Sequence, residues 1–202
     1  MGNYGYFLGN LGPGKLRLFF PYPKILHPLV SFYLKKFGYP DIAGQMRFFS
    51  VLKAVSPSPS DTILDVGSGN GIYTNQLAHD FGSRVVGLEG RPSRVNKAKE
   101  VSRSLKLNSS FEKTNLETWK GKNNYSKAIC IEVLEHIKKD DQLFSSTSKS
   151  LKKGGSFIIT IPFVGFQKIK EFSKYHRFEH VRNGYNLERI FELAQNNSLK
   201  II

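Results

Sequence analysis

Residues 63–74 read ILDVGSGNGIYT, and this stretch decides the fold. An apolar run ends in alternate glycines and continues with helical periodicity, a pattern that predicts a strand, a tight loop and a helix. Glycines let a ligand approach the backbone and allow positive φ, while the N-terminus of the following helix offers free N–H groups and a partial positive charge. Asp65 adds a carboxylate at the end of the strand. We therefore expect residues 67–71 to form a ligand-binding loop, with Asp65 holding a cationic group of the ligand.

The chain has 202 residues, 40% of them hydrophobic, which is enough for one domain with a sizeable core. Its single cysteine, Cys130, lies in an apolar run, which excludes an internal disulfide framework and favours the cytoplasm. No secretory signal is recognisable, and the most apolar early run, residues 25–34, is far shorter than the roughly 20 residues of a membrane-spanning helix. The sequence therefore predicts a cytoplasmic protein with no transmembrane segment.

The net charge of +14 favours acidic partners, such as nucleic acid, anionic lipid, or a phosphorylated or carboxylated substrate. Lysines and arginines are spread along the chain, however, and this distribution is typical of a solvated basic surface. Charge alone therefore names no substrate.

Residues 1–60 form a lead-in of different character, rich in aromatic and basic residues. Glycine, asparagine and proline in residues 1–23 predict turns without regular structure. Amphipathic patterns predict helices at 25–37 and 42–55. We interpret this segment as a flap of the same domain that covers the active site or touches a membrane surface; the alternative is ordinary packing over the sheet.

From residue 61 onward, strands and helices alternate along the chain. Strands are expected at 62–66, 84–89, 110–113, 125–131 and 157–161, and helices at 70–81, 92–107, 140–151 and from 186 onward. This order predicts an α/β fold with a doubly wound, mostly parallel sheet and helices on both faces. Ligands of such sheets bind at the carboxyl ends of the strands.

The spacing of the glycines separates two kinds of nucleotide site. The dinucleotide fingerprint G-x-G-x-x-G would place its third glycine at Ile72, whereas this chain reads G-x-G-x-G. Together with Asp65, the loop resembles motif I of the class I S-adenosylmethionine (SAM) dependent methyltransferases. Residues 131–137 (IEVLEHI), 152–162 (KKGGSFIITIP) and 180–185 (HVRNGY) are similar to later segments of that family, in the family's order. The resemblance covers about residues 61–202. It is to the small-molecule type of these enzymes, similar to methyltransferase domain 11, and it implies a Rossmann-like fold.

The resemblance implies a SAM site at the strand ends. Glu89, about 20 residues past the glycines, would accept both ribose hydroxyls. Asn115 and Leu116 would surround the adenine, although the family commonly has an aspartate where Asn115 stands; the amide oxygen can still accept the bond from the adenine amino group. Arg47 would pair with the methionine carboxylate, or else face solvent on its helix. The full set of expected cofactor-binding residues is Asp65, Gly67, Ser68, Gly69, Gly71, Glu89, Gly90, Asn115, Leu116, Glu132 and Arg47.

The activity that the resemblance implies is transfer of the SAM methyl group to an O, N or C nucleophile of a small-molecule or lipid-like acceptor. An acidic acceptor needs a base, and imidazole titrates near neutrality while a phenol can relay a proton. The candidates at the rim of the pocket are His136, His176, His180 and Tyr185. Alternatives are an RNA methyltransferase, which the net charge favours, and a SAM-binding scaffold without turnover; nucleic acid is the less favoured partner because no RNA-binding module is recognisable.

The primary expectation is a site without a metal. The alternative is a divalent cation held by Glu132, Glu135, His136 and His180, because two methyltransferase families use an E-x-x-E-H pattern in this way: those that methylate catechol intermediates of ubiquinone synthesis and those that methylate the terminal ribose of small RNAs.

The end of the chain departs from the family pattern. Class I methyltransferases usually finish with a sixth strand and an antiparallel seventh beside the fifth, whereas residues 199–202 suffice only for a sixth. We expect a truncated sheet, or a last strand that moves into the vacant place.

Overall fold

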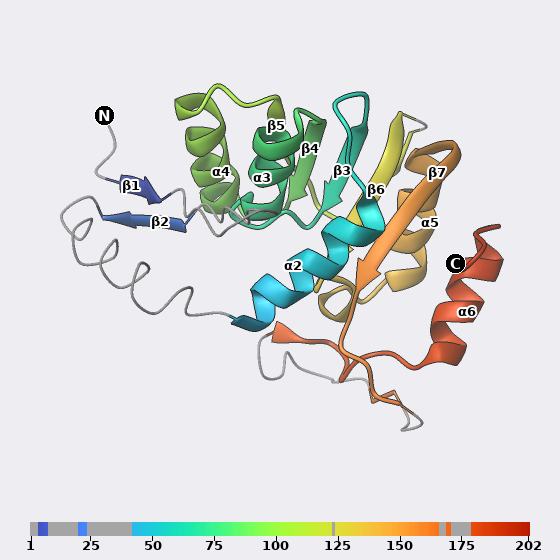
Figure 1. Ribbon diagram of the computed structural model, residues 1–202. Coiled ribbons are helices and arrows are strands. Elements are labelled where there is room, and N and C mark those ends of the chain that lie inside the picture. The colour runs from blue at the N-terminus through green and yellow to red at the C-terminus, as the bar shows by residue number, and fades with distance from the viewer. Residues whose placement is uncertain (1–3, 8–19, 24–41, 123, 166–168, 171–178) are drawn as a thin grey trace.

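The computed structural model describes residues 4–7, 20–23, 42–122, 124–165, 169–170 and 179–202 (Figure 1). The helix predicted at 25–37 and the candidate base His176 lie outside these residues. Two short strands, β1 (Tyr4–Phe7) and β2 (Phe20–Pro23), pair antiparallel. The prediction that residues 1–23 lack regular structure was therefore wrong for these strands, where aromatic residues with a preference for extended backbone outweigh the glycines and prolines.

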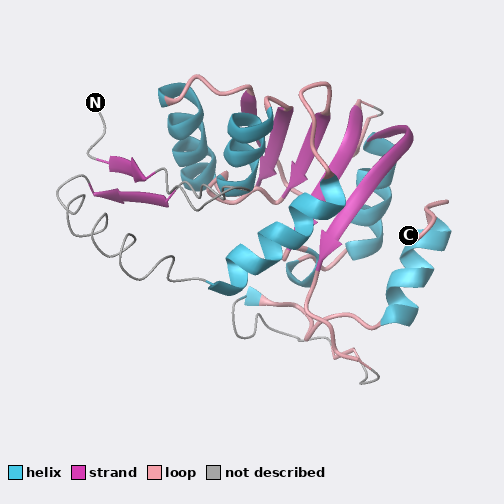
Figure 2. Ribbon diagram, viewed as in Figure 1, coloured by secondary structure: helices cyan, strands magenta, loops and turns pink. Residues whose placement is uncertain are grey.

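A parallel sheet forms the centre of the fold, and Figure 2 shows its strands side by side between layers of helices. Its strands in chain order are β3 (Thr62–Val66), β4 (Arg84–Glu89), β5 (Ser109–Lys113), β6 (Tyr125–Ile131) and β7 (Leu151–Thr160). In space the order is β5-β4-β3-β6-β7. From β3 the strands are added on one side as β4 and β5, and then on the other side as β6 and β7, so the predicted doubly wound α/β architecture is confirmed. The carboxyl ends of all five strands meet at one edge.

Helices cover both faces of this sheet. They are α2 (Ile42–Val55), α3 (Ile72–Phe81), α4 (Pro92–Ser104), α5 (Asp140–Ser150) and α6 (Leu187–Asn196), with a short 3₁₀ turn, η2 (Leu134–His136), after β6. The side chains of successive β3 residues point alternately to the two helix layers, as the period of a strand requires. Ile63 packs with α2 and α3, whereas Leu64 and Val66 join a core that includes residues of α5 and α6.

Strand β7 is the edge of the sheet within the described part of the chain. Residues 199–202 follow α6 without strand pairing, and the backbone N–H of Leu199 instead donates to the carbonyl oxygen of Ala194. The expectation of a sixth strand at 199–202 was therefore wrong: the turn that ends α6 holds the start of this segment. None of the described helices is long and apolar enough to cross a membrane.

Two glycines of the 67–71 loop make a matched test of the local fold. At Gly71 (φ +76°) a Cβ would lie 2.6 Å from both Ala98 Cβ and Phe111 Cζ, whereas at Gly69 (φ +56°) it would meet no atom of the described residues within 4 Å. Gly71→Ala should therefore lower the free energy of unfolding by on the order of 3 kcal/mol, because overpacking adds to backbone strain. Gly69→Ala should cost only about 1 kcal/mol from strain. Urea unfolding of both variants measures the difference, and equal stabilities would contradict this packing.

Candidate active site

A cavity of about 680 Å³ opens at the carboxyl ends of β3 to β6. Among the predicted cofactor-binding residues, those that line it are Gly67, Glu89, Gly90, Asn115, Leu116 and Glu132. The predicted base His136 lines it too. Sequence reasoning missed the remaining lining residues, which are Arg91, Arg94, Lys113, Glu117, Val133, Ile137 and Glu179. Most of these directly follow or neighbour a predicted position, so the ends of the predicted strands were the signal that could have found them.

The glycine loop is fastened to the neighbouring strand by its own backbone. The N–H groups of Gly67 and Ser68 both donate to the carbonyl oxygen of Leu88 at 2.9 Å. A Cβ on Gly67 would lie 2.4 Å from a methyl carbon of Val133, so glycine is needed there for the loop to close on the segment after β6. Gly69 instead faces open space, which leaves its backbone accessible to a ligand.

Glu89 connects this loop with the next one. Glu89 is 7% exposed, and its carboxylate accepts hydrogen bonds from the N–H of Gly69 at 3.1 Å and from the N–H of Arg91 at 2.8 Å. The guanidinium of Arg94 lies 3.9 Å away. A carboxylate offers about four lone-pair sites, so Glu89 can hold the loop and still accept bonds from hydroxyls in the cavity.

Asp65 lies beneath the loop and not in the cavity lining. It is 2% exposed, and its carboxylate accepts a hydrogen bond of 2.5 Å from the hydroxyl of Thr74 in α3. Burial raises the pKa of Asp65 to about 7, and the charge of Glu89 adds to the rise, although the Thr74 bond opposes it. Ser68 is also buried, and its hydroxyl has no hydrogen-bond partner among the described residues. The alternation of the strand turns the Asp65 side chain toward α3 and away from the cavity lining, and its expected contact with a cationic group of the ligand stays a prediction.

The wall below Glu89 is apolar with a polar edge. Leu116, Val133 and Ile137 supply the apolar surface, and each is almost fully buried. Asn115 stands at the edge, where its side-chain oxygen accepts the N–H of Glu117 at 3.0 Å. This combination suits a flat heteroaromatic ring that needs stacking surface and one hydrogen-bonding edge.

Glu132 directly follows β6 and has a φ of +54°, which is an uncommon backbone conformation for a residue with a side chain. Its carboxylate lies 3.6 Å from the guanidinium of Arg47 in α2. Arg47 thus pairs with a carboxylate of the protein at the mouth of the cavity, and its expected bond to a ligand carboxylate stays a prediction.

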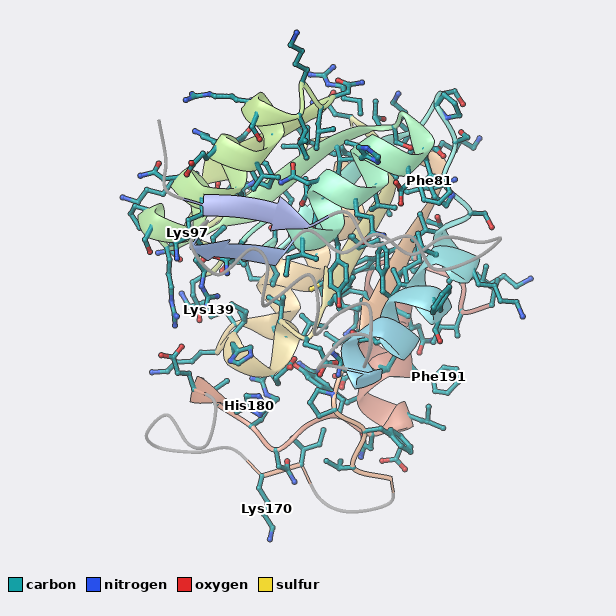
Figure 3. The ribbon with its side chains drawn as sticks, turned by 60° about the vertical axis from the view of Figure 1, so that its left-hand side comes forward. Phe81, Lys97, Lys139, Lys170, His180 and Phe191 are labelled. Carbon is teal, nitrogen blue, oxygen red and sulfur yellow. The ribbon has the colours of Figure 1, made fainter. Side chains whose placement is uncertain are left out.

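Next to the cavity, Glu135, His136 and His180 form a cluster in which one ligand atom from each lies within 4.8 Å of the others. The rings of His136 and His180 meet edge to face with centroids 4.7 Å apart, and Figure 3 labels His180 beside the turn of η2. Burial raises the pKa of Glu135 to about 7. One of its carboxylate oxygens, Oε2, has no hydrogen-bond partner among the described residues. Burial also lowers the pKa of His180, and His136 adds to this effect.

Tyr185 does not lie at the rim of the pocket. It is fully buried, and its hydroxyl bonds to Asp140 and to the carbonyl oxygen of Leu134. Burial, first, and then the charge of Asp140 raise the pKa of its phenol. Its expected position as a base was therefore wrong, since a phenol enclosed in the core cannot reach an acceptor.

A family model described as a methyltransferase domain matches residues 57–195, which is well over half of the chain. The chain therefore belongs to this family, and its fold is that of a class I SAM-dependent methyltransferase. It is 27% identical over 117 residues to the ubiquinone biosynthesis O-methyltransferase of Pelagibacter ubique, covering 57% of this chain and 48% of that protein. It is 29% identical over 102 residues to the sterol 24-C-methyltransferase of Saccharomyces cerevisiae, covering 49% and 27%. The chain thus spans about half, or less, of these curated relatives.

Solved structures share the fold. The phosphoethanolamine N-methyltransferase 2 of Haemonchus contortus, in complex with SAM, superimposes with a TM-score of 0.66 at 24% identity, covering 89% of this chain and 46% of that one. The geranyl diphosphate C-methyltransferase of Streptomyces coelicolor, whose complex contains Mg²⁺ and S-adenosylhomocysteine, gives 0.60 at 20% identity, covering 77% and 59%.

The raised pKa of Asp65 predicts a pH dependence of stability. Between pH 4 and 7 the folded state keeps a proton on Asp65 that the unfolded chain has lost, so this contribution is complete below pH 4 and disappears as the pH rises to 7. Over this range the wild type should lose up to roughly 4 kcal/mol relative to Asp65→Asn. Urea unfolding at several pH values measures both curves. Glu100→Gln, which removes an exposed carboxyl on α4, is the control and should keep the wild-type slope, and identical slopes for wild type and Asp65→Asn would contradict the assignment.

Proposed function

We propose that this chain binds SAM in the 680 Å³ cavity and transfers its methyl group to an O, N or C nucleophile of a small-molecule or lipid-like acceptor. The observation that carries the proposal is the position of Glu89, a buried carboxylate that lines the cavity and is bonded to the glycine loop. A carboxylate at this strand end accepts ribose hydroxyls.

The lining suggests how SAM is held. The ribose lies on Glu89, and the adenine stacks on the apolar wall of Leu116 and Val133 with Asn115 at its edge. The methionine part follows the half-buried Gly69, where a Cβ would meet no atom of the described residues within 4 Å, toward Arg47, which exchanges Glu132 for the ligand carboxylate. Asp65 acts indirectly, since its bond to Thr74 fixes the start of α3.

Methyl transfer needs alignment more than activation, because the sulfonium is already reactive. The acceptor atom attacks the methyl carbon, the bond between carbon and sulfur breaks, and sulfur keeps the electron pair as S-adenosylhomocysteine forms. A hydroxyl or protonated amine acceptor must also lose a proton. We propose His136 as the group that receives it, because it lines the cavity and touches His180. His176 stays a candidate from the sequence.

The alternative to His136 as proton acceptor is a divalent cation at Glu135, His136 and His180, because an imidazole that holds the ion cannot also receive the proton. The unpartnered Oε2 of buried Glu135, beside two imidazoles, is a donor set that fits such an ion, with the carboxylate of Glu132 nearby. When bound, the ion would orient an acceptor oxygen and favour its deprotonated form. The ubiquinone biosynthesis O-methyltransferases among the relatives are named for transfer to oxygen, which agrees with this chemistry.

We also propose a lipid-like acceptor and a cytoplasmic location for this protein. The names of relatives include a sterol and a geranyl diphosphate methyltransferase, which supports a lipid-like acceptor. Phe163, three residues past the end of β7 and 63% exposed, adds apolar surface at the same edge of the sheet. We place the protein in a reducing compartment, the cytoplasm, because its single cysteine is buried and unpaired.

Glu89→Gln tests the cofactor site. The introduced amide would turn an N–H₂ group toward the N–H of Gly69 or Arg91, so the ribose contact and the loop should both weaken. Calorimetric titration should give one SAM or S-adenosylhomocysteine per wild-type chain and an affinity at least about tenfold lower for the variant. Glu100→Gln, on the exposed side of α4, is the matched control and should bind like the wild type. Equal affinities for Glu89→Gln and wild type would contradict the proposed role of Glu89 in binding SAM.

Titration with Zn²⁺ or Co²⁺ tests the cation site. The wild type should bind one ion, and Glu135→Gln and His180→Ala should each weaken binding by roughly tenfold or more. His79→Ala is the control, since His79 pairs with Asp80 in α3 and takes no part in the cluster. If the His79 variant lost the ion as the others do, or the wild type bound none, the site would not be a cation site.

A further inference from the structure

We infer that Arg182 is a positioning residue, whose buried guanidinium holds the segment 134–138 in the shape that the active site needs. This inference rests on the proposed function. Segment 134–138 carries His136 and Ile137 to the cavity and Glu135 to the histidine cluster, and Arg182 follows His180 by two residues. Neither the glycine loop nor the E-x-x-E-H pattern points to this arginine.

Three backbone carbonyls of the segment converge on the guanidinium. Its Nη1 donates to the oxygens of Leu134 at 3.0 Å and Ile137 at 2.9 Å, and its Nη2 donates to the oxygen of Lys138 at 3.2 Å. The carbonyl oxygen of Leu134 also accepts the N–H of Ile137 at 3.1 Å, which closes the 3₁₀ turn, whereas Ile137 itself has extended backbone. The planar, five-donor guanidinium is suited to bind several carbonyls at once.

The buried charge has its own compensation. Arg182 is 4% exposed, and the Asp140 carboxylate lies 3.2 Å from its Nη1. The same Nη1 donates to the hydroxyl of Tyr185 at 2.5 Å, and the guanidinium carbon lies 5.4 Å from the centre of the Tyr185 ring. A charge buried in this way persists only with such partners, so the network fixes the guanidinium in one place.

The segment is also held from the cavity side. The carboxylate of Glu117, which lines the cavity, accepts the backbone N–H groups of Lys138 and Lys139 at 2.9 and 3.1 Å. On the opposite side the N–H of Val181, next to Arg182, donates to the carbonyl oxygen of Glu135 at 2.9 Å. Glu117 of the cavity lining and residues 181 and 182 of the loop that carries His180 therefore both bind segment 134–138. Arg182 sets the distance between the cavity lining and this loop.

Arg189 provides a matched comparison. It binds the same Asp140, at 3.1 Å, and also Asp141 and Glu192, but none of its hydrogen bonds in the described part of the chain goes to segment 134–138. Lysine in place of either arginine keeps the charge and loses the planar fork. Arg182→Lys and Arg189→Lys thus both perturb an ion pair of Asp140, while only the first releases the carbonyls.

The test combines hydrogen exchange with ligand titration on the full chain. We expect Arg182→Lys to speed amide exchange in residues 134–139 by about tenfold or more and to weaken S-adenosylhomocysteine binding by about tenfold. Arg189→Lys should leave both values within about twofold of the wild type. If Arg182→Lys does not fold, Tyr185→Phe, which removes one hydroxyl and keeps the ring, should give a smaller change in the same direction.

Several results would overturn the inference. Exchange at 134–139 that is unchanged in both Arg182→Lys and Tyr185→Phe would show that the guanidinium does not hold the segment. Equal losses of affinity in the two lysine variants would show that Arg182 contributes only to general stability. A wild type that binds no S-adenosylhomocysteine would refute the proposed function instead, and the exchange comparison would still decide whether Arg182 holds the segment.

Discussion

The carboxylate of Glu89 is the contact on which the site depends. It joins the glycine loop after β3 to the loop after β4 through the N–H groups of Gly69 and Arg91. Because the loop is also fastened to Leu88, the ends of two neighbouring strands become one rigid surface. The cavity lies on that surface, so a single buried acid both shapes the site and offers it lone pairs for a ligand.

Sequence patterns predicted the parts of the fold that depend on local chemistry. Strands β3, β4 and β6 begin and end where expected, because β-branched runs and glycine turns mark them in the chain itself. The glycine loop and Glu89 were found for the same reason, by spacing. The strands at residues 4–7 and 20–23 were missed, since the glycines and prolines around them are also typical of turns.

Side-chain direction and distant contacts were harder to predict. Asp65 was expected at the ligand because it stands near the end of a strand, but the same alternation that buries Ile63 turns it toward α3. Tyr185 was expected at the rim, and only the contacts with Asp140 and Arg182, on different elements, place it in the core. Likewise, no local pattern brings residues 134–138 and 179–182 together.

The most direct test is the structure of this protein crystallised with S-adenosylhomocysteine. We expect the ribose hydroxyls on the Glu89 carboxylate and the adenine ring against Leu116 and Val133, with the sulfur facing the side of Glu132 and His136. S-adenosylhomocysteine bound away from Glu89, or absent from crystals grown at saturating concentration, would contradict the proposed SAM site.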